Sequence, residues 1–347
     1  MKEFLPEWTP CDGVMLALPH CATDWNYILP EAIDQYKRLV ETFVKENLHV
    51  VLLCASRLEA ETIFAPEALH GITFVEAEFN DTWTRDYGPL TILKHGDLRV
   101  LDFGFNGWGL KFAANKDNLV NRYLNDKAVF TKGIYRNESA FILEGGSVDT
   151  DGKGTILTTS RCLCSPNRNG GLSKIEADRE LRKRLGAQHV LFLDYGFLEG
   201  DDTDSHIDTL ARMAPDNIIL FTGCRDVDDP QFEELLKMRA QLSLFRNAEG
   251  EPFNLVELPL PDPIFDEKGE RLPATYANYL VTEKIIFMPV YNQPEKDSLA
   301  MNTIKIAFPE HKVVGIDCRT LIKQHGSLHC ATMQLPCGIF NPVIFDK

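Results

Sequence analysis

Five polar residues that lie far apart in the chain could together act on a positively charged group rich in nitrogen. They are Asp86, Glu144, His206, Asp208 and Cys330. A guanidinium group is planar, delocalised and charged at any ordinary pH, and resonance makes its central carbon a poor electrophile. Its hydrolysis therefore needs carboxylates that bind the nitrogens, a strong nucleophile, and an acid that converts the leaving nitrogen to ammonia.

Each of the five residues has a chemical role in such a reaction. Asp86 and Asp208 could bind the nitrogens in bidentate fashion, and Cys330 could attack the carbon as a thiolate. His206 could protonate the departing nitrogen and then take a proton from water, while Glu144 holds the imidazole and raises its basicity. Because a thiol is mostly protonated at neutral pH, a bound cation beside Cys330 would help to form the thiolate.

Every one of these residues also has an ordinary structural interpretation. Asp86 could cap a turn, Glu144 could lie in a surface turn, and His206 could be a hydrogen-bonded core histidine. The acidic run at residues 201–204 could be a solvated loop. The spacing of His206 and Asp208 says slightly more, because the two side chains would point to one face if this segment is a strand.

His329 directly precedes Cys330 and is the obvious alternative base. In an extended segment, however, adjacent side chains point to opposite faces, and we therefore favour His206. His206, Asp208, His329 and Cys330 are also possible metal ligands. Neither an HExxH motif nor a CxxC pair accompanies them, so we expect no metal site.

The elements that must position these residues recur along the chain. Apolar alternation and helical spacing predict a polar opening residue, a hairpin, a helix and a strand, in that order. The period is too long for a thin solenoid. Five such units around one axis would bring the opening residues together, so we expect one α/β domain over residues 1–347 with cyclic internal symmetry. The opening residues are Asp86, Glu144, His206, Asn278 and Cys330, which lie 52 to 72 residues apart.

The alternative is two ordinary α/β domains whose hairpins recur by chance. The expected helices are residues 30–46, 116–124, 173–185, 230–242 and 297–308. The expected strands between them are residues 13–19, 50–54, 128–134, 190–193, 254–258 and 312–316. Hairpins are expected to turn at residues 95–97, 151–152, 215–217 and 282–283.

The composition is typical of a globular protein in water. The chain has 44% hydrophobic and 25% charged residues, and it lacks both an apolar run that could span a bilayer and the apolar centre of a signal peptide. We therefore expect a cytoplasmic protein without a membrane partner. The nine cysteines are expected to be mostly reduced, with Cys162 and Cys164 as buried thiols on one face of a strand. The net charge of −15 disfavours nucleic-acid binding and favours encounter with a cationic ligand.

Five stretches resemble the agmatine deiminase and bacterial peptidylarginine deiminase family. They occur in the family's order over almost the whole chain, so the set is far more specific than any one stretch. The stretches are Asn80-Asp81-Thr82-Trp83-Thr84-Arg85-Asp86-Tyr87-Gly88-Pro89, Leu143-Glu144-Gly145-Gly146-Ser147, Asp201-Asp202-Thr203-Asp204-Ser205-His206-Ile207-Asp208, Tyr276-Ala277-Asn278-Tyr279 and Gly326-Ser327-Leu328-His329-Cys330.

The resemblance implies a pentein fold, which is a five-bladed α/β propeller with a central active site. It implies hydrolytic deimination of a guanidine through a covalent amidino-cysteine intermediate on Cys330, without metal or cofactor. By the same resemblance His206 is the acid and base, Glu144 is its acidic partner, and Asp86 and Asp208 bind the guanidinium.

Two further residues match substrate-pocket positions of the family. They are Trp83 and Asn278. The ring face of Trp83 suits a cation or an alkyl chain, although packing in the core is an equally good interpretation.

Two departures from the family's pattern lie beside these residues and bear on the substrate. The family commonly has Gly-Gly-Gly-Asn-Ile-His-Cys where this chain has residues 324–330, and a glycine where it has Ser205. An arginine substrate would also need a cation for its α-carboxylate, for which Arg85, Arg161 and Arg168 are candidates. The resemblance favours a small cationic guanidine, agmatine, as substrate.

The products would be N-carbamoylputrescine and ammonia, in the biosynthesis of polyamines. Deimination of arginine or peptidyl-arginine, amidinotransferase chemistry on the same fold, and a non-catalytic binding protein stay open as alternatives. The sequence is compatible with a homo-oligomer but does not determine the oligomeric state.

Overall fold

The computed structural model describes residues 2–344, whose contacts divide them into two compact units. The first unit consists of residues 2–8, 93–95 and 146–329, and the second of residues 9–92, 96–145 and 330–344. Because neither unit is a continuous segment, the division does not correspond to two consecutive domains. The single domain over residues 1–347 stays a prediction.

The first unit contains three sheets of one design. In each sheet an antiparallel hairpin is followed by a helix and by a third strand parallel to the second. Helices suit these crossovers because parallel neighbours need a long connection. The sheets are β8 (Val148–Thr150), β9 (Thr155–Thr159) and β10 (His189–Leu193); β11 (Ala211–Ala214), β12 (Ile218–Gly223) and β13 (Asn254–Pro259); and β14 (Leu280–Val281), β15 (Ile285–Val290) and β16 (Lys312–Asp317).

The three crossover helices of the first unit agree with the sequence. They are α7 (Lys174–Leu185), α9 (Phe232–Leu244) and α10 (Pro294–Ala307), each within a few residues of its expected range. In α7 the ends are encoded locally: Ser173 and Glu176 form a capping box, and Gly186 ends the helix at φ 86°. The remaining elements are β1 (Lys2–Phe4), η4 (Gly145–Ser147, which begins at the last residue of the second unit), α6 (Ser160–Leu163), α8 (Ile207–Leu210) and η5 (Leu321–Gln324).

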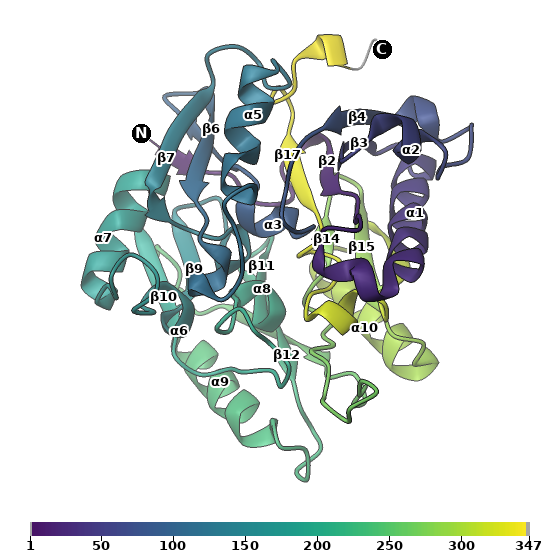
Figure 1. Cartoon of the computed structure of the whole chain (residues 1–347). Helices are drawn as coiled ribbons and strands as arrows, with labels where there is room; N and C mark the ends of the chain where they lie inside the picture. Colours follow the sequence, from purple (N-terminus) through teal and green to yellow (C-terminus); the bar gives the residue numbers. More distant parts are fainter. Residues whose placement is uncertain (1, 345–347) are drawn as a thin grey trace. The chain divides into compact units, whose positions relative to one another are not determined.

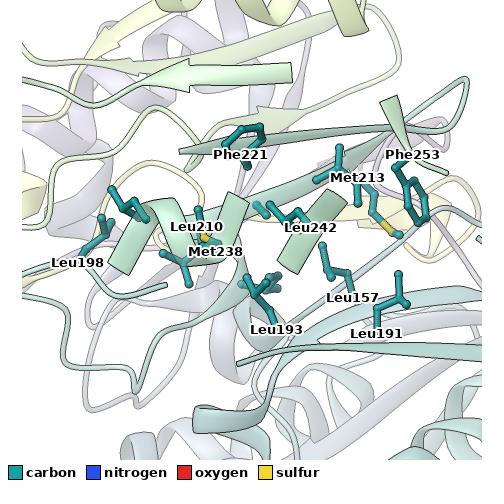
Figure 2. Packing of buried hydrophobic residues seen from close by; sticks show 14 of the residues in the cluster. Leu157, Leu191, Leu193, Leu198, Leu210, Met213, Phe221, Met238, Leu242 and Phe253 are labelled. Carbon is teal, nitrogen blue, oxygen red and sulfur yellow. The ribbon is translucent and has the colours of Figure 1, made fainter. Parts of the chain in front are cut away.

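A hydrophobic core in the first unit joins two of these sheets through α9. Leu235, Met238 and Leu242 of that helix pack with residues of the first two sheets, such as Leu157 of β9 and Phe221 of β12 (Figure 2). Each fully buried side chain of this kind contributes about 1.5–3 kcal/mol to the free energy of unfolding. This packing fixes the strands that carry the polar residues of the unit.

The second unit contains the N-terminal sheet and a second sheet built on a hairpin. In the N-terminal sheet, β17 from the C-terminal end of the chain lies antiparallel beside β2 (Figure 1, yellow beside purple), and β2, β3 and β4 are parallel. The N-terminal sheet consists of β17 (Met333–Pro336), β2 (Cys11–Ala17), β3 (His49–Cys54) and β4 (Ile72–Glu76). The second sheet contains β5 (Leu90–Lys94, whose last two residues belong to the first unit), β6 (Asp97–Gly104) and β7 (Tyr135–Ile142).

The helices of the second unit include the predicted amphipathic one. In α1, Tyr36, Leu39, Val40 and Phe43 are buried, as the helical spacing predicts. The helices are η1 (Asp24–Ile28), α1 (Leu29–Lys45), α2 (Arg57–Glu61), η2 (Leu69–Gly71), α3 (Thr84–Tyr87), α4 (Gly107–Leu110), η3 (Asp117–Leu119), α5 (Val120–Asp126) and η6 (Pro342–Ile344). In the part of the chain that the structure describes, no helix is long and apolar enough to cross a membrane.

One local prediction in the second unit is wrong. The strand expected at residues 128–134 is instead β7, which begins at Tyr135. Val129 and Phe130 are buried, but Phe130 makes only an isolated bridge to Phe340, so an apolar run was mistaken for a ladder strand. The helix expected at residues 116–124 is present as η3 followed directly by α5.

Three further predictions about polar segments are wrong. Cys162 and Cys164 do not share a strand face, because Cys162 lies in α6, whose N-cap is Thr159, and only Cys162 is fully buried. His206 and Asp208 do not lie on a strand, because His206 is the N-cap of α8 and Asp208 lies inside that helix. The residues at 328–331 form a turn, so the argument from an extended segment does not apply there.

Candidate functional site

In the second unit, Asp86 is held by an aromatic ring. It lies in the single turn of α3, where 3% of its surface is exposed. The indole Nε1–H of Trp108 donates a hydrogen bond of 2.8 Å to its Oδ2. A neutral donor on a buried carboxylate stabilises the ionised form and fixes the direction in which the carboxylate points.

The loop that carries Trp108 has a strained backbone. All four residues of 107–110 have positive φ, with values of 67°, 54°, 81° and 68°. A bulky residue such as Trp108 in this left-handed conformation costs roughly 1–2 kcal/mol. The edge contacts of its ring with Phe105 and Phe112, with centroids at 5.0 and 5.6 Å, and its bond to Asp86 oppose that cost. Strain of this kind is often found at functional sites.

The backbone of Arg85 joins three of the predicted segments. Its N–H donates to the carbonyl oxygen of Cys330 at 3.2 Å. Its own carbonyl oxygen lies so close to Gly145 that a Cβ there would be 2.1 Å away, so only glycine fits. Because Arg85 precedes Asp86 and Gly145 follows Glu144, the segments of Asp86, Glu144 and Cys330 meet here.

The side chains of this unit's other predicted residues are also buried. Glu144 is 1% exposed, and Cys330 and Trp83 are each 5% exposed. The ring of Trp83 lies 5.7 Å from that of Trp25. Core packing of Trp83 is thus observed, and its substrate contact stays a prediction.

Asp117 anchors the start of the segment that leads to Asp86. Its Oδ1 accepts the backbone N–H groups of Asn80 at 2.6 Å and Asp81 at 3.2 Å. Its Oδ2 is buried and has no hydrogen-bond partner among residues 2–344. Burial raises the pKa of Asp117 to about 7, although these hydrogen bonds and the charge of Lys116 lower it.

Replacing Asp117 by Asn should flatten the dependence of stability on pH. With its pKa raised in the fold, Asp117 contributes stability that is full below its ordinary pKa of about 3.9 and is lost as pH rises through about 7. The amide of Asp117→Asn still accepts both N–H groups but does not titrate. Denaturant unfolding at pH 5 and pH 8 should show that the free energy of unfolding falls less in the variant than in the parent as pH rises. An equal fall in both proteins would contradict the assignment.

In the first unit, His206 follows a clamped loop. Arg168 is buried and binds Asp204 Oδ2 at 2.5 Å and the carbonyl oxygen of Thr203 at 3.1 Å. Asp204 and Ser205 have φ values of 66° and 63°. This left-handed backbone accounts for the glycine common in the family at the position of Ser205, because glycine adopts such angles without strain.

Asp208, Asn278 and His329 contact one another in the same unit. His329 Nδ1 lies 2.7 Å from Asp208 Oδ2, and its backbone N–H donates to Asn278 Oδ1 at 2.9 Å. The Nδ2 of Asn278 donates to the carbonyl oxygen of Asp208 at 3.4 Å. All three side chains are at most 1% exposed. The fold thus brings together three segments that are 51 to 121 residues apart.

The pKa of Asp208 is lowered in spite of its burial. Burial alone would raise its pKa, but the hydrogen bond and charge of His329, together with the charges of His206 and Arg212, lower the pKa below its ordinary value. A buried carboxylate held in the ionised form suits a cationic ligand.

His329 is engaged at both ring nitrogens. In addition to Asp208 at Nδ1, its Nε2 lies 2.7 Å from Glu7 Oε1. A histidine held in this way is poorly placed to exchange protons with a substrate. His206 as the base stays a prediction, and the argument against His329 now comes from its two ring contacts and not from an extended segment.

The profile of one protein family matches nearly the entire chain. It is that of the Porphyromonas-type peptidyl-arginine deiminases, and it covers residues 3–336. The chain belongs to this family. The resemblance inferred from the five stretches is confirmed.

Members of this deiminase family and their relatives match over their whole length. A Vibrio parahaemolyticus protein assigned as an agmatine deiminase is 31% identical, over 96% of both chains. A structure from Porphyromonas gingivalis described as an arginine deiminase is 42% identical, with a TM-score of 0.93 over 98% of this chain and 100% of that one. A substrate-bound C. jejuni agmatine deiminase with a cysteine-to-serine substitution is 37% identical, with a TM-score of 0.89 over 98% and 97% of the two chains.

The same fold also occurs in a protein with much lower sequence identity. A dimethylarginine dimethylaminohydrolase structure shares it at 13% identity with a TM-score of 0.50. The predicted mixed α/β fold, with structural neighbours among the penteins, is confirmed.

Four residues of the site were not assigned their roles from the sequence. Trp108 had one local signal, since glycines flank it on both sides. Glu7 and Arg212 had none, because single charged residues are usually solvated. His329 was considered only as a base or a metal ligand, and its contact with Asp208 depends on tertiary structure.

Proposed function

We propose that the chain hydrolyses agmatine to N-carbamoylputrescine and ammonia, with Cys330 as the nucleophile. Membership of the family makes it a hydrolase of carbon–nitrogen bonds in amidines. We further propose the five-bladed pentein propeller, which the repeated order of hairpin, helix and strand supports. The reaction would serve polyamine biosynthesis in the cytoplasm.

The observation that carries the proposal is a pair of buried carboxylates with matched donors. Asp86 has one oxygen on the indole N–H of Trp108 at 2.8 Å, and Asp208 has one oxygen on the imidazole of His329 at 2.7 Å. Each carboxylate is fixed by a ring, as planar recognition of a guanidinium requires. A buried, oriented carboxylate is unusual in a core unless a cation binds it.

The proposed reaction has two halves. The thiolate of Cys330 adds to the guanidinium carbon, and the carbon–nitrogen bond then breaks as His206 gives its proton to the leaving ammonia. The product of this half is an amidino group joined to sulfur. His206 then takes a proton from water, which adds to the same carbon, and the carbon–sulfur bond breaks to return the thiolate and release the ureido product.

The remaining predicted residues support these steps. Glu144 orients His206 and favours its protonated form. Asn278 holds the backbone of His329, the residue before Cys330. Trp83 would offer a ring face to the cation or to the alkyl chain.

The hydrogen bonds that two candidate arginine side chains already make favour agmatine over arginine as the substrate. Free arginine carries an α-carboxylate that needs a cation. Arg168 binds Asp204 and Thr203, and the side chain of Arg85 binds Gln334 and Met333. Two of the three candidate arginines therefore already have structural partners, and agmatine makes no demand on them.

The named relatives also support agmatine as the substrate. Agmatine deiminases of C. jejuni and Enterococcus faecalis share the fold, with TM-scores of 0.89 and 0.83. The C. jejuni structure with bound substrate carries serine in place of a cysteine, which supports a cysteine nucleophile in this chain.

Turnover on three substrates tests the proposal. Purified protein is incubated with agmatine, with arginine and with an arginine-containing peptide, and ammonia and product mass are measured. We expect the highest kcat/KM with agmatine and a ureido product. A higher value with arginine or the peptide would assign the alternative substrate, and a guanidinylated amine would indicate an amidinotransferase.

Replacing Trp108 by Phe should weaken substrate binding. The variant keeps the ring but loses the N–H that fixes Asp86. A hydrogen bond to a charged group contributes about 1.5–3 kcal/mol, so kcat/KM for agmatine should fall roughly 10- to 100-fold. Steady-state kinetics with agmatine provide the measurement.

Trp25→Phe is the matched control for this variant. Trp25 is fully buried, and its indole donates a bond of the same 2.8 Å length to Thr82 Oγ1. Both variants should lose similar stability, whereas only Trp108→Phe should lose kcat/KM. Equal kinetic losses would show that the effect of Trp108 is structural.

A further inference from the structure

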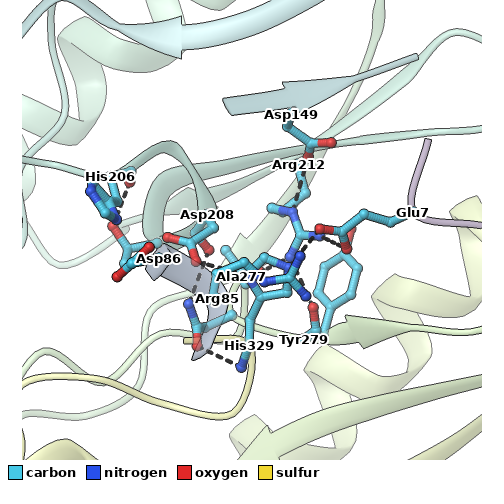
Figure 3. A network of polar contacts seen from close by, with 12 residues as sticks. Glu7, Arg85, Asp86, Asp149, His206, Asp208, Arg212, Ala277, Tyr279 and His329 are labelled. Atoms are coloured by element: carbon cyan, nitrogen blue, oxygen red, sulfur yellow. Dashed lines mark hydrogen bonds and ion pairs between the residues drawn. The ribbon is translucent and has the colours of Figure 1, made fainter. Parts of the chain in front are cut away.

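A chain of charged residues, buried except for the partly exposed Glu7, leads away from Asp208 in the first unit (Figure 3). His329 bridges Asp208 and Glu7, with contacts of 2.7 Å at each ring nitrogen. The other carboxylate oxygen of Glu7 binds Arg212, whose Nε lies 3.0 Å from Asp149 Oδ2. Glu7 comes from the N-terminal segment and is 322 residues from His329 in sequence.

Carboxylate oxygens face both ring nitrogens of His329. Asp208 Oδ2 lies at Nδ1 and Glu7 Oε1 lies at Nε2, and Glu7 is itself paired with Arg212. Because an ionised carboxylate can only accept hydrogen bonds, this geometry suits an imidazolium, which donates from both nitrogens.

Glu7 itself is held rigidly by Arg212. The guanidinium of Arg212 donates to the carbonyl oxygens of Ala277 at 3.2 Å and Tyr279 at 2.8 Å. It also lies over the ring of Tyr279 at 4.8 Å. With Asp149 on its Nε, Arg212 is fixed on several sides, so it presents Glu7 to His329 in one orientation.

We propose that Glu7 is a positioning residue, which holds His329 as a doubly protonated clamp that orients Asp208 for the guanidinium of the substrate. The proposal rests on the function proposed above. Asp208 touches the substrate in this account, whereas Glu7 acts only through His329. Among the described residues of the first unit, the titratable and charged groups that face the clamp include Glu7, Asp149, His206, Asp208, Arg212 and Tyr279.

The test is Glu7→Gln with two readouts. The amide keeps the shape of the side chain but removes the charge that favours the imidazolium. We expect KM for agmatine to rise on the order of tenfold, with a smaller change in kcat. The alkaline limb of kcat/KM against pH should move to lower pH, which a merely structural defect would not cause.

The second readout does not depend on activity. Nitrogen-15 NMR of the histidine side chains, assigned with His329→Gln, reports whether one or both ring nitrogens of His329 carry a proton. In the parent both should be protonated at neutral pH, and in Glu7→Gln the second proton should be lost at lower pH than in the parent. A singly protonated His329 in the parent at neutral pH would overturn the proposal, even if Glu7→Gln does not fold.

Glu3→Gln is the matched control, since Glu3 is an exposed residue of the same segment. It should leave KM, the pH profile and the NMR signals unchanged. A pH profile of Glu7→Gln that coincides with the parent's would refute the positioning role. If the parent does not turn over agmatine, the proposed function fails, while the NMR measurement still decides the state of His329.

Discussion

Replacement of Cys330 by serine should reduce ammonia release from agmatine by a factor on the order of 10⁴ or more, the scale on which loss of a nucleophile acts. Serine is nearly isosteric, but its hydroxyl has a far higher pKa than a thiol and does not ionise beside a cation. Binding should persist, because the carboxylates at positions 86 and 208 are unchanged. Ammonia assays and calorimetric titration with agmatine would measure the two effects separately.

Cys318→Ser serves as the control for this variant. Cys318 is fully buried, and its thiol contacts the carbonyl oxygen of Ile316 at 3.2 Å. Serine at this position keeps a donor, so activity should stay close to that of the parent. If Cys330→Ser were as active as Cys318→Ser, Cys330 could not be the nucleophile.

Replacement of His206 by asparagine should lower kcat for agmatine by about 10²- to 10⁴-fold, the usual contribution of a positioned acid and base. Asparagine cannot donate a proton to leaving ammonia or take one from water. Because His206 is fully buried, thermal unfolding must accompany the kinetics to show that the variant is folded.

The matched control is His49→Asn. His49 is partly buried, hydrogen-bonds Thr73 Oγ1 at 2.9 Å, and is not part of any of the five motif stretches in the sequence. It should lose some stability but little activity. Near-parental kcat in His206→Asn would contradict the assignment and would move the acid and base role to another residue.

Much of the fold could be predicted because its signals are local. The helix α7 begins at a capping box and ends at a glycine with positive φ, and both features can be read from the sequence. The apolar face of α1 follows the helical period. The repeated order of hairpin, helix and strand followed from such local patterns alone.

The wrong strand prediction arose because a buried apolar segment does not always pair as a strand. Residues 128–134 contain buried apolar side chains, such as Val129, but do not form a strand. The strand that follows them, β7, consists largely of polar residues, several of which are exposed. Strand pairing, not apolarity, decides which segment joins a sheet. The two-residue spacing of His206 and Asp208 fits a strand, but the two residues lie instead at the start of α8.

The candidate residues could be named from the sequence, but the residues that orient them could not. Asp86, Glu144, His206, Asp208 and Cys330 were proposed from their chemistry and the family's motifs, and their roles stay predictions. The residues that orient two of them, Trp108 for Asp86 and Glu7 through His329 for Asp208, depend on contacts between distant parts of the sequence. The glycines beside Trp108 are a weak local signal of its left-handed backbone, but a contact across 322 residues has no local signature.

The most direct test of the account is to identify the covalent intermediate. Parent protein is mixed with saturating agmatine, quenched in acid at successive times, and digested for peptide mass spectrometry. The account predicts that the peptide containing Cys330 carries the mass of agmatine less ammonia during turnover, and that this adduct disappears when substrate is exhausted. Steady release of ammonia with Cys330 unmodified at every time, or an adduct on another cysteine, would contradict it.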